Sequence, residues 1–363
     1  KFRHLSTESS SEAGKFETSR AIFQKEIMNS INDPSIDEVV VMSCSQIGKT
    51  EILLNAIGYY IHYAPAPILI VHPTLEMARA WSQDRLAPMI RDTEILKYKV
   101  ADVKSKDSGN TVLHKIFDGG HITACGANSP ASLASRPIKI VLCDEIDRYP
   151  PTAGSEGDPV MLAKRRSATF WDSKLVLTST PTVKGASAIE SAYEDTDKRL
   201  FYVPCHKCRK KQVLKWSQVQ WEKNKPETAR YVCVHCEKKW TDIERIKNIA
   251  KGHWKATDRF NGRAGFRLNG LYSVWVTMEE AVGEFLRAKK LPETLRVFVN
   301  TYLGETWEDQ GERIDDLGLY DRREDYIIPD EIVLLTAGVD VQDDRIEVEV
   351  LGWGLEEETW SID

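Results

Sequence analysis

The stretch VVVMSCSQIGKTE, residues 39–51, places a run of β-branched and apolar residues directly before a Gly-Lys-Thr triplet. The apolar run predicts a buried β-strand over Val39–Met42, and the periodicity after it predicts a helix over Lys49–His62. A strand that ends in a loop at the start of a helix can wrap backbone N–H groups around phosphates. The stretch therefore predicts a phosphate-binding loop, although Ser43 stands where such loops usually begin with glycine. The alternative is a chance Gly-Lys-Thr after a strand.

The residues of this loop have distinct expected roles. Lys49 would bring positive charge to the β and γ phosphates of ATP, and Thr50 would bring a hydroxyl to Mg²⁺. Ser43 is small enough to start the loop if its backbone need not be left-handed. The residues expected to surround the phosphates are Ser43, Gln46, Ile47, Gly48, Lys49 and Thr50. Gln24, upstream of the loop, is a candidate for contacting the adenine edge, or else a polar residue on an amphipathic helix.

A pair of carboxylates follows another predicted buried strand. The segment IKIVLCDEID predicts a strand over Ile138–Leu142, and Asp144 and Glu145 follow it closely. Ligands of open α/β sheets bind at the carboxyl ends of the strands, where the phosphate loop would also lie. Asp144 would then hold Mg²⁺ through water, and Glu145 would polarise the attacking water. The alternative is a cluster of acids at a helix start, stabilised by the helix dipole.

Hydroxyl groups end a third predicted strand, in the segment KLVLTSTPT. The segment Thr178–Pro181, with Thr180 beside the γ-phosphate, would couple phosphate loss to motion. An ordinary strand exit with proline as the stop is the alternative. Arg136, shortly before the acidic strand, is a candidate for stabilising the charge on a neighbouring subunit's phosphates in a ring. A surface arginine explains Arg136 equally well.

The rhythm of apolar runs predicts an α/β fold. Further strands are expected at Ile68–Val71 and Leu175–Leu177, with helices over Leu75–Ile90 and Pro159–Phe170 between them. This alternation is typical of a parallel sheet with helices on both faces. Later, residues 276–306 show helical spacing interrupted at a Leu-Pro pair, which predicts two helices.

Changes in composition divide the chain into four predicted parts. Residues 1–200 would form the ATPase core with an N-terminal arm, and residues 201–240, rich in cysteine, lysine and tryptophan, a zinc-ribbon insertion. Residues 241–328 would form a helical continuation or linker, and residues 329–363 the start of another domain.

Four of the seven cysteines form two CxxC pairs. Each CxxC turn points two thiolates at one position, and two such turns complete the tetrahedron that structural zinc prefers. The expected Zn²⁺ ligands are Cys205, Cys208, Cys233 and Cys236. A closed four-sulfur site is structural, and the alternatives are a thiol redox pair or chance. The nearby lysines and tryptophans would contact DNA or a partner, or the tryptophans would only fill a thin core.

Composition excludes several classes of protein. The chain has 363 residues and a net charge of −6, so contacts with polyanions must be made by local basic patches. No apolar run approaches the ~20 residues of a membrane-spanning helix, and no signal-peptide core is present at the N-terminus. We therefore expect a cytoplasmic protein that does not associate with membranes.

The last segment predicts a β-hairpin. Asp340 lies near the end of the strand VLLTAGVD, and IEVEVLGWG follows after a turn that contains Asp343 and Asp344. The hairpin is built like the first two strands of a ribonuclease H-like nuclease, which holds metal ions with several carboxylates. Here only Asp340 is a candidate ligand, so we expect these 363 residues not to cut DNA.

Taken in order, the motifs resemble one known family. QIGKTE, CDEID, LTSTPT, the CxxC…CxxC ribbon, GFRLNGLYSVW, NTYLGETWE and AGVDVQDDRIEVEVLGWG are similar to the large terminase subunit of tailed phages, in the lambda-type (GpA-like) branch. The resemblance implies a P-loop NTPase of the additional-strand type and a C-terminal endonuclease that is mostly missing here. It also implies ATP-driven packaging of double-stranded DNA in the host cytoplasm. The implied partners are the terminase small subunit, the portal protein of the procapsid and further copies of the chain in a ring.

Two other functions remain possible from the residues. One is a helicase-like DNA-remodelling ATPase with a structural zinc ribbon. The other is a zinc-ribbon adaptor whose ATPase is inactive, which the intact Lys49, Asp144 and Glu145 disfavour.

Overall fold

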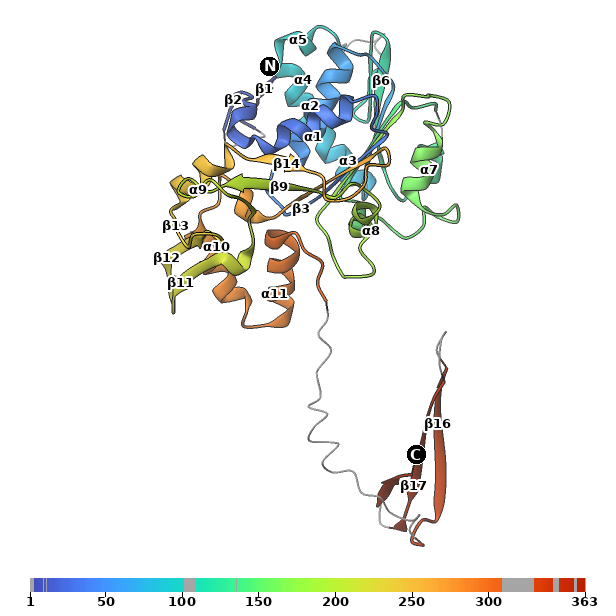
Figure 1. Cartoon of the computed structure of the whole chain (residues 1–363). Helices are drawn as coiled ribbons and strands as arrows, with labels where there is room; N and C mark the ends of the chain where they lie inside the picture. The colour runs from blue at the N-terminus through green and yellow to red at the C-terminus, as the bar shows by residue number, and fades with distance from the viewer. Residues whose placement is uncertain are drawn as a thin grey trace. The chain divides into compact units, whose positions relative to one another are not determined.

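The computed structural model describes residues 3–8, 10, 12–100, 109–134, 136–308, 330–341, 346–355 and 358–362. They belong to two compact units, Lys1–Glu308 and Asp309–Asp363, which are coloured along the chain in Figure 1. No helix in these ranges combines the length and the apolar character needed to cross a bilayer.

A ten-stranded sheet forms the centre of the first unit. Its strands are β3 (Glu38–Ser43), β4 (Ile68–His72), β5 (His114–Phe117), β6 (Gly120–Gly126), β7 (Ile140–Asp144), β8 (Lys174–Ser179), β9 (Arg199–Pro204), β10 (Lys211–Val213), β14 (His253–Lys255) and β15 (Arg263–Leu268). The order is β10-β9-β15-β3-β8-β7-β4-β6-β5, and β14 also pairs with β9. Neighbours from β9 to β6 are parallel, whereas β5, β10 and β14 pair antiparallel. β8 thus lies between β3 and β7.

Helices cover both faces of this sheet, and the last two pack instead beside the small sheet that contains β12 (Lys225–Val232). The helices are α1 (Phe23–Asn32), α2 (Lys49–His62), α3 (Leu75–Trp81), α4 (Ala87–Asp92), α5 (Glu94–Lys97), α6 (Pro130–Ala134), α7 (Pro159–Arg165), α8 (Ala188–Glu194), α9 (Asp242–Ile249), α10 (Met278–Ala288) and α11 (Pro292–Phe298). Shorter turns are η1 (Thr18–Ala21), η2 (Ser82–Leu86), η3 (Ile146–Arg148), η4 (Trp216–Gln218), η5 (Gly270–Tyr272) and η6 (Val299–Leu303).

The side chains of β3 show how the strand is buried on both sides. Val39 and Val41 join one core with residues of α1 and α2, while Val40 and Met42 join another with residues of α7 and α8. Because successive side chains of a strand point to opposite faces, one continuous apolar run serves both cores. Figure 1 shows α1 and α2 apart from α7 and α8, across the strands. The expected α/β fold with helices on both faces is therefore confirmed.

The predicted helices differ from the structure at some ends. α2 has the predicted bounds, and the helix expected over residues 75–90 is present as α3, the π-helical turn η2 and α4. The helix expected to reach Phe170 ends at Arg165. Two hydrogen bonds end it there, from Ser167 Oγ to the Lys164 carbonyl at 2.7 Å and from Ile138 N to the Arg166 carbonyl at 3.1 Å.

Small sheets complete the described chain. A three-stranded sheet contains β11 (Val219–Glu222), β12 (Lys225–Val232) and β13 (Lys239–Trp240). A two-stranded sheet joins β1 (His4–Leu5) to β2 (Gly14–Lys15) in the N-terminal arm. The second unit holds an antiparallel sheet of β16 (Leu334–Val341), β17 (Ile346–Trp353) and β18 (Thr359–Ser361).

Candidate functional site

The carboxyl ends of β3, β8 and β7 form the site, because these three strands are parallel neighbours. β3 leads into the Gly48-Lys49-Thr50 loop and α2, and β7 ends at Asp144. β8 lies between them and places Thr178 directly beside Asp144 in the strand register. Three segments far apart in sequence therefore meet at one edge.

The loop takes its left-handed residues at Gln46 and Gly48, with φ values of 56° and 88°. Ser43 ends the extended strand β3 and has no positive φ. Serine therefore suits this position, because its backbone need not be left-handed. A side chain at Gly48 would bring its Cβ within 2.2 Å of Gln24 Nε2. Glycine is therefore favoured at position 48 by its left-handed conformation, and a larger residue would also displace the Gln24 amide from its place beside the loop.

Lys49 and Glu145 form the centre of the site. The Lys49 ammonium lies 3.1 Å from Glu145 Oε1 and donates to Thr180 Oγ1 at 3.3 Å. Glu145 Oε2 accepts from the Thr180 hydroxyl at 3.0 Å and from the Thr180 backbone N–H at 3.3 Å. These contacts hold Glu145 in a left-handed conformation, with φ of 55°, that costs energy in a residue with a side chain.

The ionisation of Glu145 follows from these partners. Burial alone would raise its pKa, but the Lys49 charge, the Lys49 hydrogen bond and the two Thr180 donors outweigh it and lower the pKa below its usual value. Glu145 is therefore a carboxylate at neutral pH, able to accept a proton.

Asp144 lies deeper than Glu145 and in a different environment. It is 7% exposed and accepts a hydrogen bond from Thr178 Oγ1 at 2.7 Å. Burial raises its pKa from 3.8 to about 6, and the neighbouring Glu145 adds to the rise, while Thr178 and Lys49 oppose it. A buried carboxylate of this kind gains from a divalent cation, which restores the charged form.

The raised pKa of Asp144 predicts a pH dependence of stability. The native state binds the proton more tightly than the unfolded chain, so stability is lost as the pH rises from about 4 to about 6. The rise in pKa to about 6 corresponds to about 3 kcal/mol. In Mg²⁺-free buffer, Asp144→Asn should therefore be more stable than wild type at pH 8, and the difference should shrink towards pH 4. Urea unfolding at pH 4.5, 6 and 8 measures this, and a difference independent of pH would contradict it.

His72, at the end of β4, was missed by the sequence analysis. Its Nδ1 lies 3.9 Å from Asp144 Oδ2, too far for a hydrogen bond. Burial lowers the pKa of His72 to about 4, so the imidazole is neutral at pH 7 and the contact is no salt bridge. A lone histidine in the apolar run ILIVH carries no signal of a site. Only the sheet order brings it to Asp144.

A cavity of about 610 Å³ opens onto the loop. Of the expected residues, it is lined by Gln24, Gln46, Gly48, Lys49, Thr50 and Glu145. Gln24 is buried and donates from Nε2 to the Ile47 carbonyl at 3.2 Å, so it supports the loop. Three further cationic side chains line the cavity and were not predicted, Lys15, Arg20 and Arg85, together with Trp275. Arg85 stands on the π-helical turn η2, a distortion that often marks functional sites.

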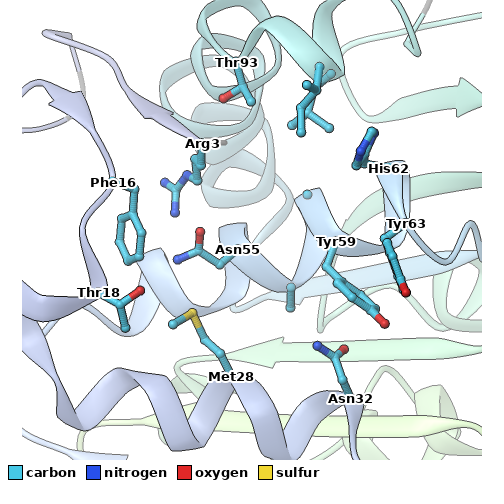
Figure 2. Close-up of a pocket in the computed structure, with 14 residues that line it drawn as sticks. Arg3, Phe16, Thr18, Met28, Asn32, Asn55, Tyr59, His62, Tyr63 and Thr93 are labelled. Atoms are coloured by element: carbon cyan, nitrogen blue, oxygen red, sulfur yellow. The ribbon is translucent and has the colours of Figure 1, made fainter. Parts of the chain in front are cut away.

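A smaller cavity of about 330 Å³ lies between the N-terminal arm and the outer side of α2, and Figure 2 shows Arg3, Phe16 and Asn55 on its wall. Arg3 donates from Nη1 to the Glu51 carbonyl at 3.0 Å and pairs with the Glu51 carboxylate. These two contacts join the N-terminal arm to the first turn of α2, next to Thr50.

Arg136 lies away from this site in its own subunit. Its side chain is exposed, and Nη1 contacts His114 Nε2 on β5 at 3.1 Å. It does not line the cavity at the loop. A contact with the phosphates of a neighbouring subunit stays a prediction.

The segment at η6 supports the phosphate loop from outside the α/β core. Ser45 donates from its backbone N and from Oγ to the Thr301 carbonyl, both at 2.8 Å. Asn300 Nδ2 donates to the Thr182 carbonyl at 2.6 Å, just after the third strand end. η6 therefore touches two of the three segments that form the site, a connection no sequence pattern revealed.

The four CxxC cysteines converge at a second location. Their sulfur atoms lie within 4.8 Å of one another, with Cys205 and Cys236 at 3.8 Å and Cys208 and Cys233 at 3.9 Å. These separations exclude disulfides and match the edge of about 3.8 Å of a tetrahedron with zinc–sulfur bonds of about 2.3 Å. Burial would raise the pKa of Cys233, but backbone donors at His235 and Cys236 outweigh it and lower it to about 7. The donor set thus fits a closed metal site.

In the second unit, Asp340 lies on β16 directly opposite Glu347 of β17. Two carboxylate residues therefore occupy paired positions on adjacent strands. Asp343 and Asp344, expected in the turn, lie outside the described residues.

Comparison with known proteins identifies related chains. Residues 10–254 match the model of the ATPase domain of the phage terminase large subunit gpA, and residues 263–363 match that of its endonuclease domain. The chain is 31% identical to the terminase large subunit of Enterobacteria phage P21, over 100% of this chain and 61% of that protein. It is 30% identical to that of Escherichia phage lambda, over 99% of this chain and 60% of that protein.

The chain therefore spans about 60% of the length of these two relatives. Among solved structures, the large terminase of bacteriophage HK97 has a similar fold, with a TM-score of 0.50 at 13% identity. That similarity covers 97% of this chain and 63% of the HK97 chain.

Proposed function

The chain belongs to the gpA family of phage terminase large subunits, and we propose that it hydrolyses ATP to drive double-stranded DNA into a procapsid. The convergence of Lys49, Glu145 and Asp144 at one sheet edge carries this proposal. The family match supports it over a helicase-like remodelling ATPase.

Different residues of the chain have separate roles in ATP hydrolysis. Backbone N–H groups of the loop and the Lys49 ammonium bind the β and γ phosphates of ATP. Thr50 and Asp144 would hold Mg²⁺, which would supply charge neutralisation on the phosphates. Glu145 accepts the proton of the attacking water.

The Lys49 ammonium and the Glu145 carboxylate form an ion pair at 3.1 Å. Phosphate oxygens compete for the same ammonium, so binding of ATP frees Glu145 for water. Thr180 contacts both side chains and is placed to relay that change to the segment after β8.

Other parts take roles from the same family. The order in which β8 separates β3 from β7 supports a P-loop fold of the additional-strand type over residues 1–200. Residues 201–240 would be a zinc ribbon, in which the four cysteines, whose sulfur atoms lie within 4.8 Å of one another, would hold Zn²⁺. Residues 241–328 would be a helical continuation or linker, and an RNase H-like nuclease with Asp340 as a metal ligand would begin within residues 329–363. The endonuclease family match starts earlier, at residue 263, and so also includes β15, α10 and α11.

The partners follow from packaging. We infer that the working motor is a ring of this protein docked on the portal protein, with the terminase small subunit bound and Arg136 facing a neighbour's phosphates. The partners act in the host cytoplasm.

The experiment that tests the ATPase compares two substitutions at Thr50. Thr50→Val keeps the shape of the side chain but removes the hydroxyl, and we expect ATP turnover with Mg²⁺ to fall about a hundredfold. Thr50→Ser keeps the hydroxyl and should remain within about fivefold of wild type. Absence of turnover in wild type, with and without duplex DNA, would overturn the proposed function.

A further inference from the structure

Positive charge is concentrated in the ribbon. Residues 201–240 contain ten Lys and Arg and three Glu, a net charge of +7 in a chain whose total is −6. A zinc ion held by four thiolates would reduce this to +5. The rest of the chain is therefore strongly acidic, and the ribbon differs from it in sign.

The cysteine site gathers part of this charge at one end of the ribbon. Because the four sulfur atoms lie within 4.8 Å of one another, the two CxxC turns converge, and basic residues stand inside the first turn and within three residues after each turn. We call this set the knuckle face; its members are Lys207, Arg209, Lys210, Lys211, Lys238 and Lys239. All are exposed except Lys238, which is half-buried.

Among the described residues, no ion pair joins a member of the knuckle face to a carboxylate. One acid lies near the face: Glu244 contacts His206 Nε2 at 3.3 Å. The pKa of Glu244 is lowered by the Thr241 backbone donor and also by the charges of His206 and Lys238. Lys211 contacts His253 Nε2 at 3.2 Å, and Glu237 is the only acid within the two turns. Cations carried by two converging turns repel one another unless an anion lies against them. The face therefore fits a polyanion.

The tryptophans of the ribbon decide which kind of polyanion fits. Trp240 is fully buried, and Trp216 packs against Phe285 and Phe298 at ring distances of 5.4 and 5.2 Å. Trp221 lies 5.9 Å from Phe285. Single-stranded nucleic acids are bound by exposed aromatic rings on which bases stack, whereas Trp240 is buried and Trp216 and Trp221 are half-buried against other aromatic side chains. The face thus offers cations to phosphates without a stacking platform.

The ribbon is also joined to the nucleotide site. β9 and β10, on either side of the first turn, belong to the main sheet, and Trp216 lies 5.8 Å from Tyr302 of η6. The neighbouring Thr301 accepts both hydrogen bonds from Ser45 of the phosphate loop. A ligand on the knuckle face is therefore held by the unit that binds ATP.

Building on the proposed function, we propose that the knuckle face binds the phosphate backbone of double-stranded DNA without regard to sequence. The contact is electrostatic, so its affinity falls with salt as counterions return to the duplex. One surface with which the motor binds DNA would then lie on the ribbon.

The test measures binding of a labelled duplex of about 30 base pairs to the whole 363-residue chain by fluorescence anisotropy, over a series of NaCl concentrations. The test variant combines Lys207→Gln, Lys210→Gln and Lys239→Gln. The control combines Lys223→Gln, Lys225→Gln and Lys290→Gln, which remove the same charge elsewhere. We expect the slope of log affinity against log salt to fall by about 2 to 3 in the test variant and far less in the control.

Equal slopes and affinities in wild type and the test variant would overturn this inference, as would tighter binding of a single strand with the same number of phosphates. Metal content, checked by elemental analysis, should match wild type because no ligand is changed. DNA binding is measured without ATP. Failure of the ATPase would therefore show as absent turnover with the salt slope intact, and failure of the knuckle face as an unchanged slope with turnover intact.

Discussion

Replacing Glu145 with glutamine should leave ATP binding near the wild-type level and reduce ATP turnover about a thousandfold. The amide keeps the size of the side chain and can still accept a hydrogen bond from the Thr180 hydroxyl, which lies 3.0 Å from Glu145 Oε2. It cannot accept a proton from water, and general-base catalysis contributes about 10²- to 10⁴-fold. Steady-state hydrolysis and binding of a fluorescent ATP analogue separate these two effects.

Asp147 supplies a matched control for this experiment. It lies two residues further along and carries the same charge, but its carboxylate accepts from Ile189 N at 2.7 Å and from the Thr182 hydroxyl at 2.9 Å. Asp147→Asn should lower stability by about 1 kcal/mol and leave turnover within a few-fold of wild type. Turnover by Glu145→Gln that equals wild type would show that another group activates the water.

The second large effect is expected at the cysteine site. Elemental analysis of the purified chain should find about one zinc per molecule, and Cys205→Ser should lose it, since a serine hydroxyl stays protonated and binds zinc poorly. The binding energy of structural zinc, on the order of 10 kcal/mol in small domains, is also folding energy. We therefore expect the ribbon to unfold in the variant, with new protease cleavage between residues 205 and 240.

His235→Ala is the control for the zinc experiment. His235 is an exposed residue inside the second CxxC turn, and its Nε2 contacts the Lys211 carbonyl at 3.3 Å. It is no ligand of the four-sulfur set, so the variant should keep its zinc and its resistance to protease. A fully folded wild-type chain without metal would contradict the proposed zinc site.

Much of the site could be predicted because local sequence fixes local structure. The strand, loop and helix from Val39 to His62 have strong periodic signals and a glycine at the one position where a Cβ would collide with Gln24. The acids after β7 and the two CxxC turns carry their chemistry in short motifs. Each of these features depends on residues only a few positions apart.

What the sequence by itself determined was thus the phosphate loop, the acidic pair, the four cysteines and the alternation of strands and helices. Tertiary structure alone decided that β8 separates β3 from β7, that β15 joins the sheet from residue 263, and that η6 supports the loop through Thr301. It also decided that Arg136 contacts His114 and does not line the cavity at the loop, and that the ribbon tryptophan Trp216 packs against Phe285. The reason is physical: periodicity reports which face of an element is buried, but not which distant element covers it, and that choice depends on packing across the whole unit.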